Sequence, residues 1–161
     1  MDRDRFEQLY EEHAQPLFGF LVYRTGDRAL AEDVLADAFE RVLRARRRFD
    51  PRRASEKTWL YSIALNALRD HLRRADAEAR ALGRVEAVPA AGASGELELV
   101  EERDRLGRAL ATLSDDERET VALRYGADLT IPEIAEALDE KLTTVDGRLR
   151  RALRKLREEL G

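Results

Sequence analysis

A basic segment that also carries aromatic rings spans residues 41–74. Its rings are Phe49, Trp59 and Tyr61, and Trp59 is the only tryptophan of the chain. Arginine attracts phosphates without regard to base sequence, and an exposed ring offers a face on which an unstacked base can lie. The segment therefore predicts binding to opened or single-stranded DNA in preference to closed duplex.

A helix is expected to begin near Ser55 within this segment, with one apolar and one polar side. At about 100° per residue, the apolar side should face the core. An alternative stays open, in which Trp59 caps a neighbouring helix or loop and the arginines form a solvated face. The apolar side gathers Leu60, Tyr61, Ala64, Leu65, Leu68 and Leu72, and the polar side gathers Trp59, Ser62, Asn66, Asp70 and Arg73.

A second basic segment, residues 143–157, forms the last part of a pattern that is typical of a helix-turn-helix motif. Thr130-Ile-Pro-Glu133 is a capping box that opens a short helix, and after about four residues Thr143 or Thr144 is expected to cap a final helix to Leu160. In such motifs the second helix enters the major groove. Gly147, Arg150 and Arg151 should reach bases and Arg154 phosphate, unless this is a plain helical hairpin with a solvated basic face.

Composition excludes several classes of site. The 161 residues include no Cys and two His, so we expect no disulfide, metal site or cofactor. No Gly-rich phosphate loop or nucleophile motif appears, which argues against an enzyme. No apolar run approaches the length of a membrane span, so we expect a cytoplasmic protein without membrane insertion.

Charge is segregated along the chain although the formal net charge is only -4. Residues 41–53 hold seven Arg against one Asp, and residues 143–157 hold six Arg or Lys against one Asp. The first twelve residues and the stretch 96–104 are mainly acidic. Two basic patches on an acidic body should bind free DNA weakly, a weakness for which positioning by a larger partner could compensate.

Periodicity predicts an all-α protein of two small helical domains. Helices are expected over about 4–24 and 29–48, with Gly26 ending the first and Asp27 capping the second, and then from Ser55. The inward side of the second helix should carry Ala31, Leu35, Ala38, Phe39, Val42 and Leu43. Periodicity is lost from about Ala75, and helical patterns return near Leu97. The predicted organisation is a domain at 1–75, a flexible linker at 76–95 and a helix-turn-helix domain at 96–161.

Three stretches together resemble the extracytoplasmic-function (ECF) sigma factors, the smallest class of bacterial RNA polymerase sigma subunits. They are FEQLYEEHAQPLFGFLVYRTGDRALAEDVLADAFERVLR, FDPRRASEKTWLYSIALNALRDHLRR and LATLSDDERETVALRYGADLTIPEIAEALDEKLTTVDGRLRRALRKLREEL. This resemblance covers nearly all of the chain. It implies a non-enzymatic initiation subunit whose partners are core RNA polymerase, promoter DNA and an anti-sigma protein.

The resemblance also implies roles for particular residues. The first domain would dock on the polymerase clamp and melt the minus-ten element, and the second would read the minus-thirty-five element. The clamp-binding residues would be Asp33, Asp37, Glu40, Arg41 and Arg44. The minus-ten residues would be Phe49, Asp50, Arg52, Ser55, Trp59, Ser62, Asn66, Arg69, Arg73 and Arg74. The minus-thirty-five residues would be Thr143, Thr144, Asp146, Gly147, Arg148, Arg150, Arg151 and Arg154.

Two features leave alternatives open. Without the resemblance, the clamp-binding face would be read as a solvated charged face with an Asp37–Arg41 pair. In the second domain Asp139, Asp146 and Gly147 depart from the family pattern, which predicts altered promoter specificity or weak minus-thirty-five binding. The competing function is a helix-turn-helix regulator that binds duplex DNA alone and does not bind polymerase.

Overall fold

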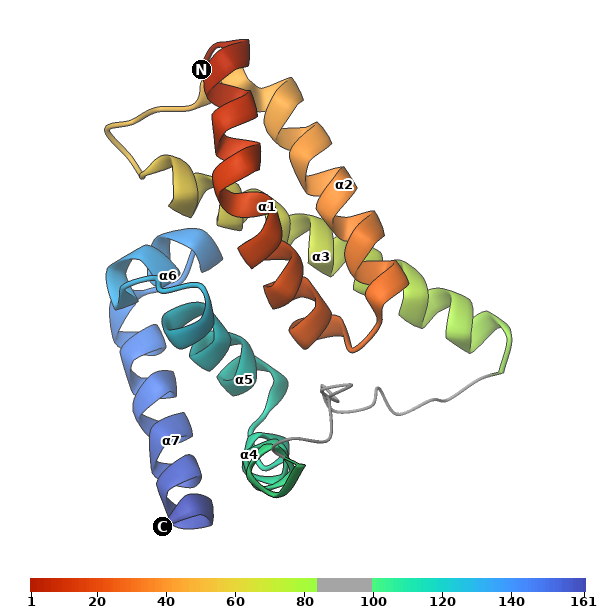
Figure 1. Cartoon of the computed structure of the whole chain (residues 1–161), viewed down its shortest axis with the longest axis vertical. Helices are drawn as coiled ribbons and strands as arrows, with labels where there is room; N and C mark the ends of the chain where they lie inside the picture. The colour runs from red at the N-terminus through yellow and green to blue at the C-terminus, as the bar shows by residue number, and fades with distance from the viewer. Residues whose placement is uncertain (84–99) are drawn as a thin grey trace.

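Every element that the structure describes is helical, which confirms the all-α prediction. The computed structural model describes residues 1–83 and 100–161, so residues 84–95 of the predicted linker lie outside it. Figure 1 shows the arrangement. The elements are α1 (Arg3–Thr25), α2 (Arg28–Ala45), a 3-10 turn (Arg46–Arg48), α3 (Glu56–Ala81), α4 (Val100–Ala111), α5 (Asp115–Val121), a π-helical turn (Ala122–Gly126), α6 (Ile131–Leu138) and α7 (Leu142–Leu160).

The predicted caps of the first domain are confirmed. Gly26 ends α1 in the left-handed region at φ 66°, where glycine has no Cβ to clash. The Asp27 carboxylate accepts from the Leu30 N–H at 3.2 Å and opens α2. Ser55 opens α3, and its hydroxyl accepts from the Thr58 N–H at 3.1 Å. Local side-chain chemistry thus sets where these helices begin and end.

Helix ends in the second domain follow the same chemistry with one exception. Both capping boxes form, Ser114 with Glu117 and Thr130 with Glu133. Asp139 ends α6 at φ 53°, a left-handed position that Asp tolerates. The prediction that a threonine caps α7 is wrong. The helix begins at Leu142, because the Lys141 carbonyl already accepts from backbone N–H groups, and no side chain caps it.

The third helix is longer than expected. It continues to Ala81, so residues 76–81, assigned to the linker from their weak periodicity, are helical. Most of these residues are exposed. A helical segment without a buried face shows no apolar periodicity, which is why the pattern alone ended the helix too early.

Helices α1, α2 and α3 enclose the core of the first domain. Leu17, Val42 and Leu65 are fully buried there, one from each helix. The inward side of α2 differs from the expectation in two ways, and the first is that Leu43 is 38% exposed. The second is that Val34, which the expected set left out, is fully buried. The buried side of α2 therefore includes Val34 and turns away from Leu43.

The second domain packs against the first through α6, which lies beside the N-terminal half of α3 (Figure 1). Ile134 and Leu129 are fully buried and join the same hydrophobic cluster as Leu60. In the described part of the chain, no helix is long and apolar enough to cross a membrane. Within the same residues, no group of His, Asp and Glu could hold a metal ion.

A buried hydroxyl in this core makes a stability prediction. Tyr61 is fully buried, its hydroxyl has no hydrogen-bond partner, and burial raises its pKa to about 12. Tyr61→Phe should raise the free energy of unfolding by about 1 kcal/mol, because an unsatisfied polar group is removed while the ring stays. Urea unfolding would measure this. Tyr61→Leu, which also removes the ring that contacts Phe20, should lower stability, and a loss for Tyr61→Phe would show that the hydroxyl is satisfied.

Candidate nucleic-acid and polymerase interfaces

The FDPRRAS loop between α2 and α3 is held as a compact turn. The Asp50 carboxylate accepts from the Arg52 N–H at 2.9 Å, and the Asp50 carbonyl accepts from the Arg53 N–H at 3.1 Å. The Phe49 ring lies 5.1 Å from the Trp59 ring, centroid to centroid. Asp50 therefore shapes the loop. Trp59 is half-buried, because it packs against both Phe49 of the loop and the core, which agrees with the alternative that Trp59 caps a neighbouring loop.

A cavity of about 370 Å³ opens between this loop and α3. It brings together three predicted minus-ten residues, Asp50, Trp59 and Ser62. Its volume is in the range of small-ligand pockets. Arg53 and Ala54 of the FDPRRAS loop also line it, together with three residues to which the sequence assigned no role, Arg48, Thr58 and Glu136. Arg48 directly precedes the loop in a basic run, a signal that was available, whereas Glu136 comes from α6 and is near only in three dimensions.

The polar side of α3 continues from this cavity. Asn66 is exposed, and so are Arg73 and Arg74 farther along the helix. Arg73 forms an ion pair with Asp70 at 2.9 Å. Arg69 differs from these, because its guanidinium contacts the Glu119 carboxylate of α5 at 3.3 Å. Of the predicted strand-binding residues on this side, Arg69 is thus engaged by the second domain.

The predicted polymerase face of α2 forms a shallow hollow with α3. A cavity of about 520 Å³ is lined by all five predicted residues, together with Ala36, His71 and Arg74. Arg41 donates to both Asp37 oxygens at 3.1 Å and reaches Asp70 at 3.0 Å, and His71 lies 2.9 Å from Asp37. Burial raises the pKa of Asp37, but these hydrogen bonds outweigh it and hold the pKa below its ordinary value. Asp37 and Arg41 therefore tie α2 to α3.

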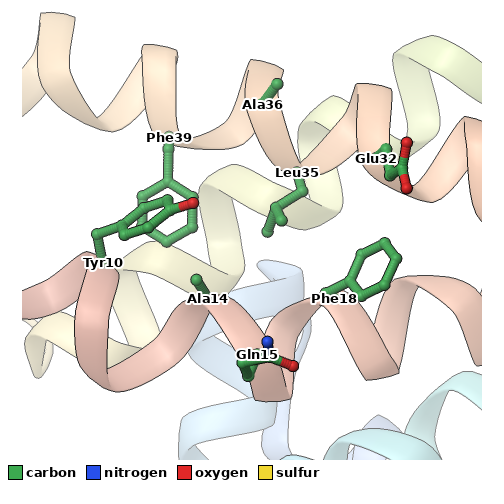
Figure 2. Close-up of a pocket in the computed structure, with 8 residues that line it drawn as sticks. All are labelled: Tyr10, Ala14, Gln15, Phe18, Glu32, Leu35, Ala36 and Phe39. Carbon is green, nitrogen blue, oxygen red and sulfur yellow. The ribbon is translucent and has the colours of Figure 1, made fainter.

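An apolar groove lies on the other side of α2, between it and α1. Its volume is about 380 Å³. Figure 2 shows Tyr10, Ala14 and Phe18 of α1 facing Leu35 and Phe39 of α2, with the polar Gln15 and Glu32 nearby. Tyr10 is 48% exposed, and its ring packs edge to face against the Phe39 ring with the centroids 4.8 Å apart. Sequence periodicity placed Leu35 and Phe39 on the inward side of α2, but it could not show that they meet α1 along an open groove.

The exposed side of α7 keeps most of the predicted minus-thirty-five residues. Thr143, Thr144, Arg150, Arg151 and Arg154 are exposed. Asp146 lies 3.1 Å from Arg150, so the negative charge on this face is paired within the helix. A Cβ on Gly147 would meet only the flexible end of Arg151, at 3.4 Å, so the fold itself does not require glycine there.

Arg148 is the exception on this helix. Its side chain is 13% exposed and donates to both oxygens of Glu140, at 2.9 and 2.6 Å, and to Thr120 at 3.4 Å. The hydrogen bond from Arg148, the strongest influence on this carboxylate, holds the pKa of Glu140 below its ordinary value of 4.5. In this arrangement Arg148 fastens the turn before α7, and its guanidinium is engaged within the second domain.

The chain is similar to sigma factors over nearly its whole length. Residues 9–78 match the model of sigma-70 region 2, and residues 109–158 match that of sigma-70 region 4. RNA polymerase sigma factor CarQ of Myxococcus xanthus is 36% identical, covering 99% of this chain and 91% of CarQ. ECF RNA polymerase sigma factor SigX of Bacillus subtilis is 33% identical, covering 98% and 88%. The chain belongs to the ECF RNA polymerase sigma factors of the sigma-70 family.

This sigma factor directs RNA polymerase to promoters and initiates transcription, and the similarity over both domains argues against a regulator that acts without polymerase. Its fold matches solved sigma factors. The sigma factor RpoE from Bartonella quintana, crystallised with NepR, superposes with a TM-score of 0.79 at 23% identity, covering 97% of this chain and 96% of that one. CnrH, solved with the cytosolic domain of CnrY, gives 0.71 at 26%, covering 99% and 89%.

The bidentate pair on α7 makes a testable distinction between two neighbouring arginines. Arg148→Gln should lower the free energy of unfolding by about 2 kcal/mol, the scale of a charged hydrogen bond that is partly buried. Arg150→Gln removes the same charge from an exposed position and should change stability little. Urea unfolding at neutral pH would measure both.

Acid gives the second measurement for this pair. A carboxylate with a lowered pKa contributes stability above its unfolded value, near 4.5, and this contribution is lost as pH falls through the folded pKa. The destabilisation of Arg148→Gln relative to wild type should therefore shrink below pH 4.5. Equal stability of Arg148→Gln and wild type at neutral pH would contradict the structural role of Arg148.

Proposed function

We propose that the two domains divide promoter recognition, the first opening the minus-ten element and the second reading the minus-thirty-five element. The observation that carries this proposal is the cavity beside Trp59, at the end of a polar, arginine-bearing helix face. Unstacking a base costs a few kcal/mol, and a preformed pocket with a ring at its side can offset that cost. The sigma factor itself would catalyse no reaction, since the polymerase supplies the chemistry.

In this proposal the minus-ten strand follows α3 from the loop toward its C-terminal end. Asp50 and Ser55 shape the loop and the helix start, as their hydrogen bonds to backbone N–H groups support. Asn66, exposed on the same side as Ser62, offers amide hydrogen bonds to a base. Arg52, Arg73 and Arg74 are exposed and would attract phosphates.

Polymerase binding would use both sides of α2. Asp33, Glu40 and Arg44 are exposed, whereas Asp37 and Arg41 act through the link to α3. The groove beside Tyr10 and Phe39 adds apolar area, and interfaces draw most of their affinity from such apolar anchors within a polar rim. Ala36 is exposed and lines both the groove and the hollow, which places it at the centre of the proposed docking surface.

Minus-thirty-five binding would use Thr143, Thr144, Arg150, Arg151 and Arg154 on the exposed side of α7. The Asp146–Arg150 pair presents an acceptor and a donor side by side, which suits cytosine N4 and guanine respectively. Packing within the fold does not require glycine at position 147, so a close approach of the backbone to DNA is the simplest explanation for Gly147. An anti-sigma protein is the further partner that the family implies, and the Bartonella relative was solved with one.

Asn66 tests the minus-ten role. Asn66→Ala should slow open-complex formation roughly fivefold, the factor for about 1 kcal/mol from one hydrogen bond, and leave polymerase affinity unchanged. Run-off transcription and a core-binding titration would measure the two quantities. A template opened in advance over the minus-ten element should restore most of the rate. Glu78→Ala, exposed on the same helix beyond the basic face, is the matched control. Equal loss of rate and polymerase affinity would contradict the proposed role.

Ala36 tests the docking surface. Ala36→Arg places a long charged side chain into the groove and the hollow, and it should weaken binding to core polymerase roughly tenfold, about 1.4 kcal/mol. The matched control is Ala29→Arg, the same change at an exposed position of α2 that lines neither cavity. A labelled sigma factor titrated with core polymerase gives both affinities. Unchanged affinity for Ala36→Arg would move the docking surface elsewhere.

A further inference from the structure

A buried carboxylate joins the two domains. Glu119 of α5 has a side chain only 8% exposed. It accepts from the Arg24 Nε at 2.8 Å and contacts the Arg69 Nη2 at 3.3 Å, and both arginines belong to the first domain. A charged carboxylate buried to this extent needs such partners. The partners of Glu119 are in place only while the domains are together.

A second link joins two helix caps. Thr58, in the first turn of α3, is 2% exposed and donates from its hydroxyl to the Glu133 carboxylate at 3.2 Å. Ser55, which caps α3, donates to the Thr58 hydroxyl at 3.0 Å. The other oxygen of Glu133 accepts from the Thr130 N–H and completes the capping box of α6. The start of α3 and the start of α6 are therefore connected through one hydrogen-bonded chain.

The same contact places acidic groups on the surface proposed for minus-ten DNA. Glu136 of α6 lines the cavity beside Trp59, where its carboxylate would repel a nucleotide phosphate. Glu119 engages the guanidinium of Arg69, which the resemblance assigns to phosphate binding. Acidic side chains of the second domain thus lie on the surface of the first domain to which the minus-ten DNA is proposed to bind.

We infer that the free sigma factor is closed, with its own second domain competing with the opened promoter strand for the minus-ten surface. The inference rests on the proposed minus-ten role of the first domain and adds how that surface is regulated. DNA binds only the open molecules, so the observed association constant equals the intrinsic association constant multiplied by the open fraction. Polymerase, by binding the two domains apart, would release the minus-ten surface at the promoter.

The arrangement of the domains can be measured without DNA. The sequence contains no Cys, so Glu11→Cys and Glu159→Cys, both exposed and one in each domain, accept spin labels at defined positions. Pulsed electron paramagnetic resonance on the full chain should give one narrow distance distribution. Glu119→Gln keeps the shape of the side chain and removes its charge, and it should broaden the distribution toward longer distances. A broad distribution in the otherwise wild-type chain would overturn the inference.

DNA binding gives the second measurement. A labelled single-stranded minus-ten oligonucleotide should bind free Glu119→Gln roughly tenfold more tightly than wild type, because the open fraction rises. Arg24→Gln should have the same effect from the other side of the contact, and the double variant should add little to either change. The matched control is Asp128→Asn, the same charge change at a 90% exposed side chain in a left-handed position that Asn tolerates.

The outcomes separate this inference from the proposed function. If the wild-type protein binds the oligonucleotide and both variants bind it with the same affinity as wild type, the competition is overturned and the minus-ten role stays in place. A narrow distribution that broadens in Glu119→Gln, with no oligonucleotide binding by any variant, would support the closed contact and contradict the minus-ten role. Thermal unfolding of Glu119→Gln and Arg24→Gln checks that each variant is folded, and either one suffices for the comparison.

Discussion

The buried Glu119 carboxylate is the interaction on which the mutual placement of the domains depends. Arginines from α1 and α3 compensate its charge, and both lie in the other domain. Apolar packing of α6 on α3 supplies area without direction, because hydrophobic contact is largely non-specific in orientation. Hydrogen bonds to a buried charge require defined geometry, so they select one arrangement among those that the apolar surfaces would allow.

Arginine serves two purposes in this sigma factor, and burial separates them. Arg41 and Arg148 are largely enclosed, and each makes bidentate hydrogen bonds to a carboxylate of its own domain. Arg74, Arg151 and Arg154 stay exposed, where a guanidinium can exchange water for phosphate at little cost. A net charge of -4 is compatible with DNA binding because exposed arginines gather on α3 and α7, while acids neutralise enclosed ones such as Arg41 and Arg148.

Sequence reasoning was most accurate where structure is local. The caps at Gly26, Asp27 and Ser55 and both capping boxes depend on residues within one helical turn, so a short pattern contains the whole interaction. It failed where one pattern fits two outcomes. A threonine near a helix start need not be its cap, and an exposed helix end such as 76–81 has no apolar periodicity. On α2, the apolar pattern fitted a side with Leu43 as well as the side with Val34 that is actually buried.

By itself, the sequence determined the helical class, the order of the elements, most of the core and the family, because periodicity, capping and motif spacing are properties of neighbouring residues. Only the tertiary structure decided which charged side chains are available. Arg148 turns to Glu140, Arg69 to Glu119, and Glu136 reaches a cavity of the other domain. The physical reason is that a charge is paired by whatever lies within a few ångströms of it. Arg148 and Glu140 are eight positions apart across a turn, and Arg69 and Glu119 are 50 positions apart, so both pairs become neighbours only when the chain folds.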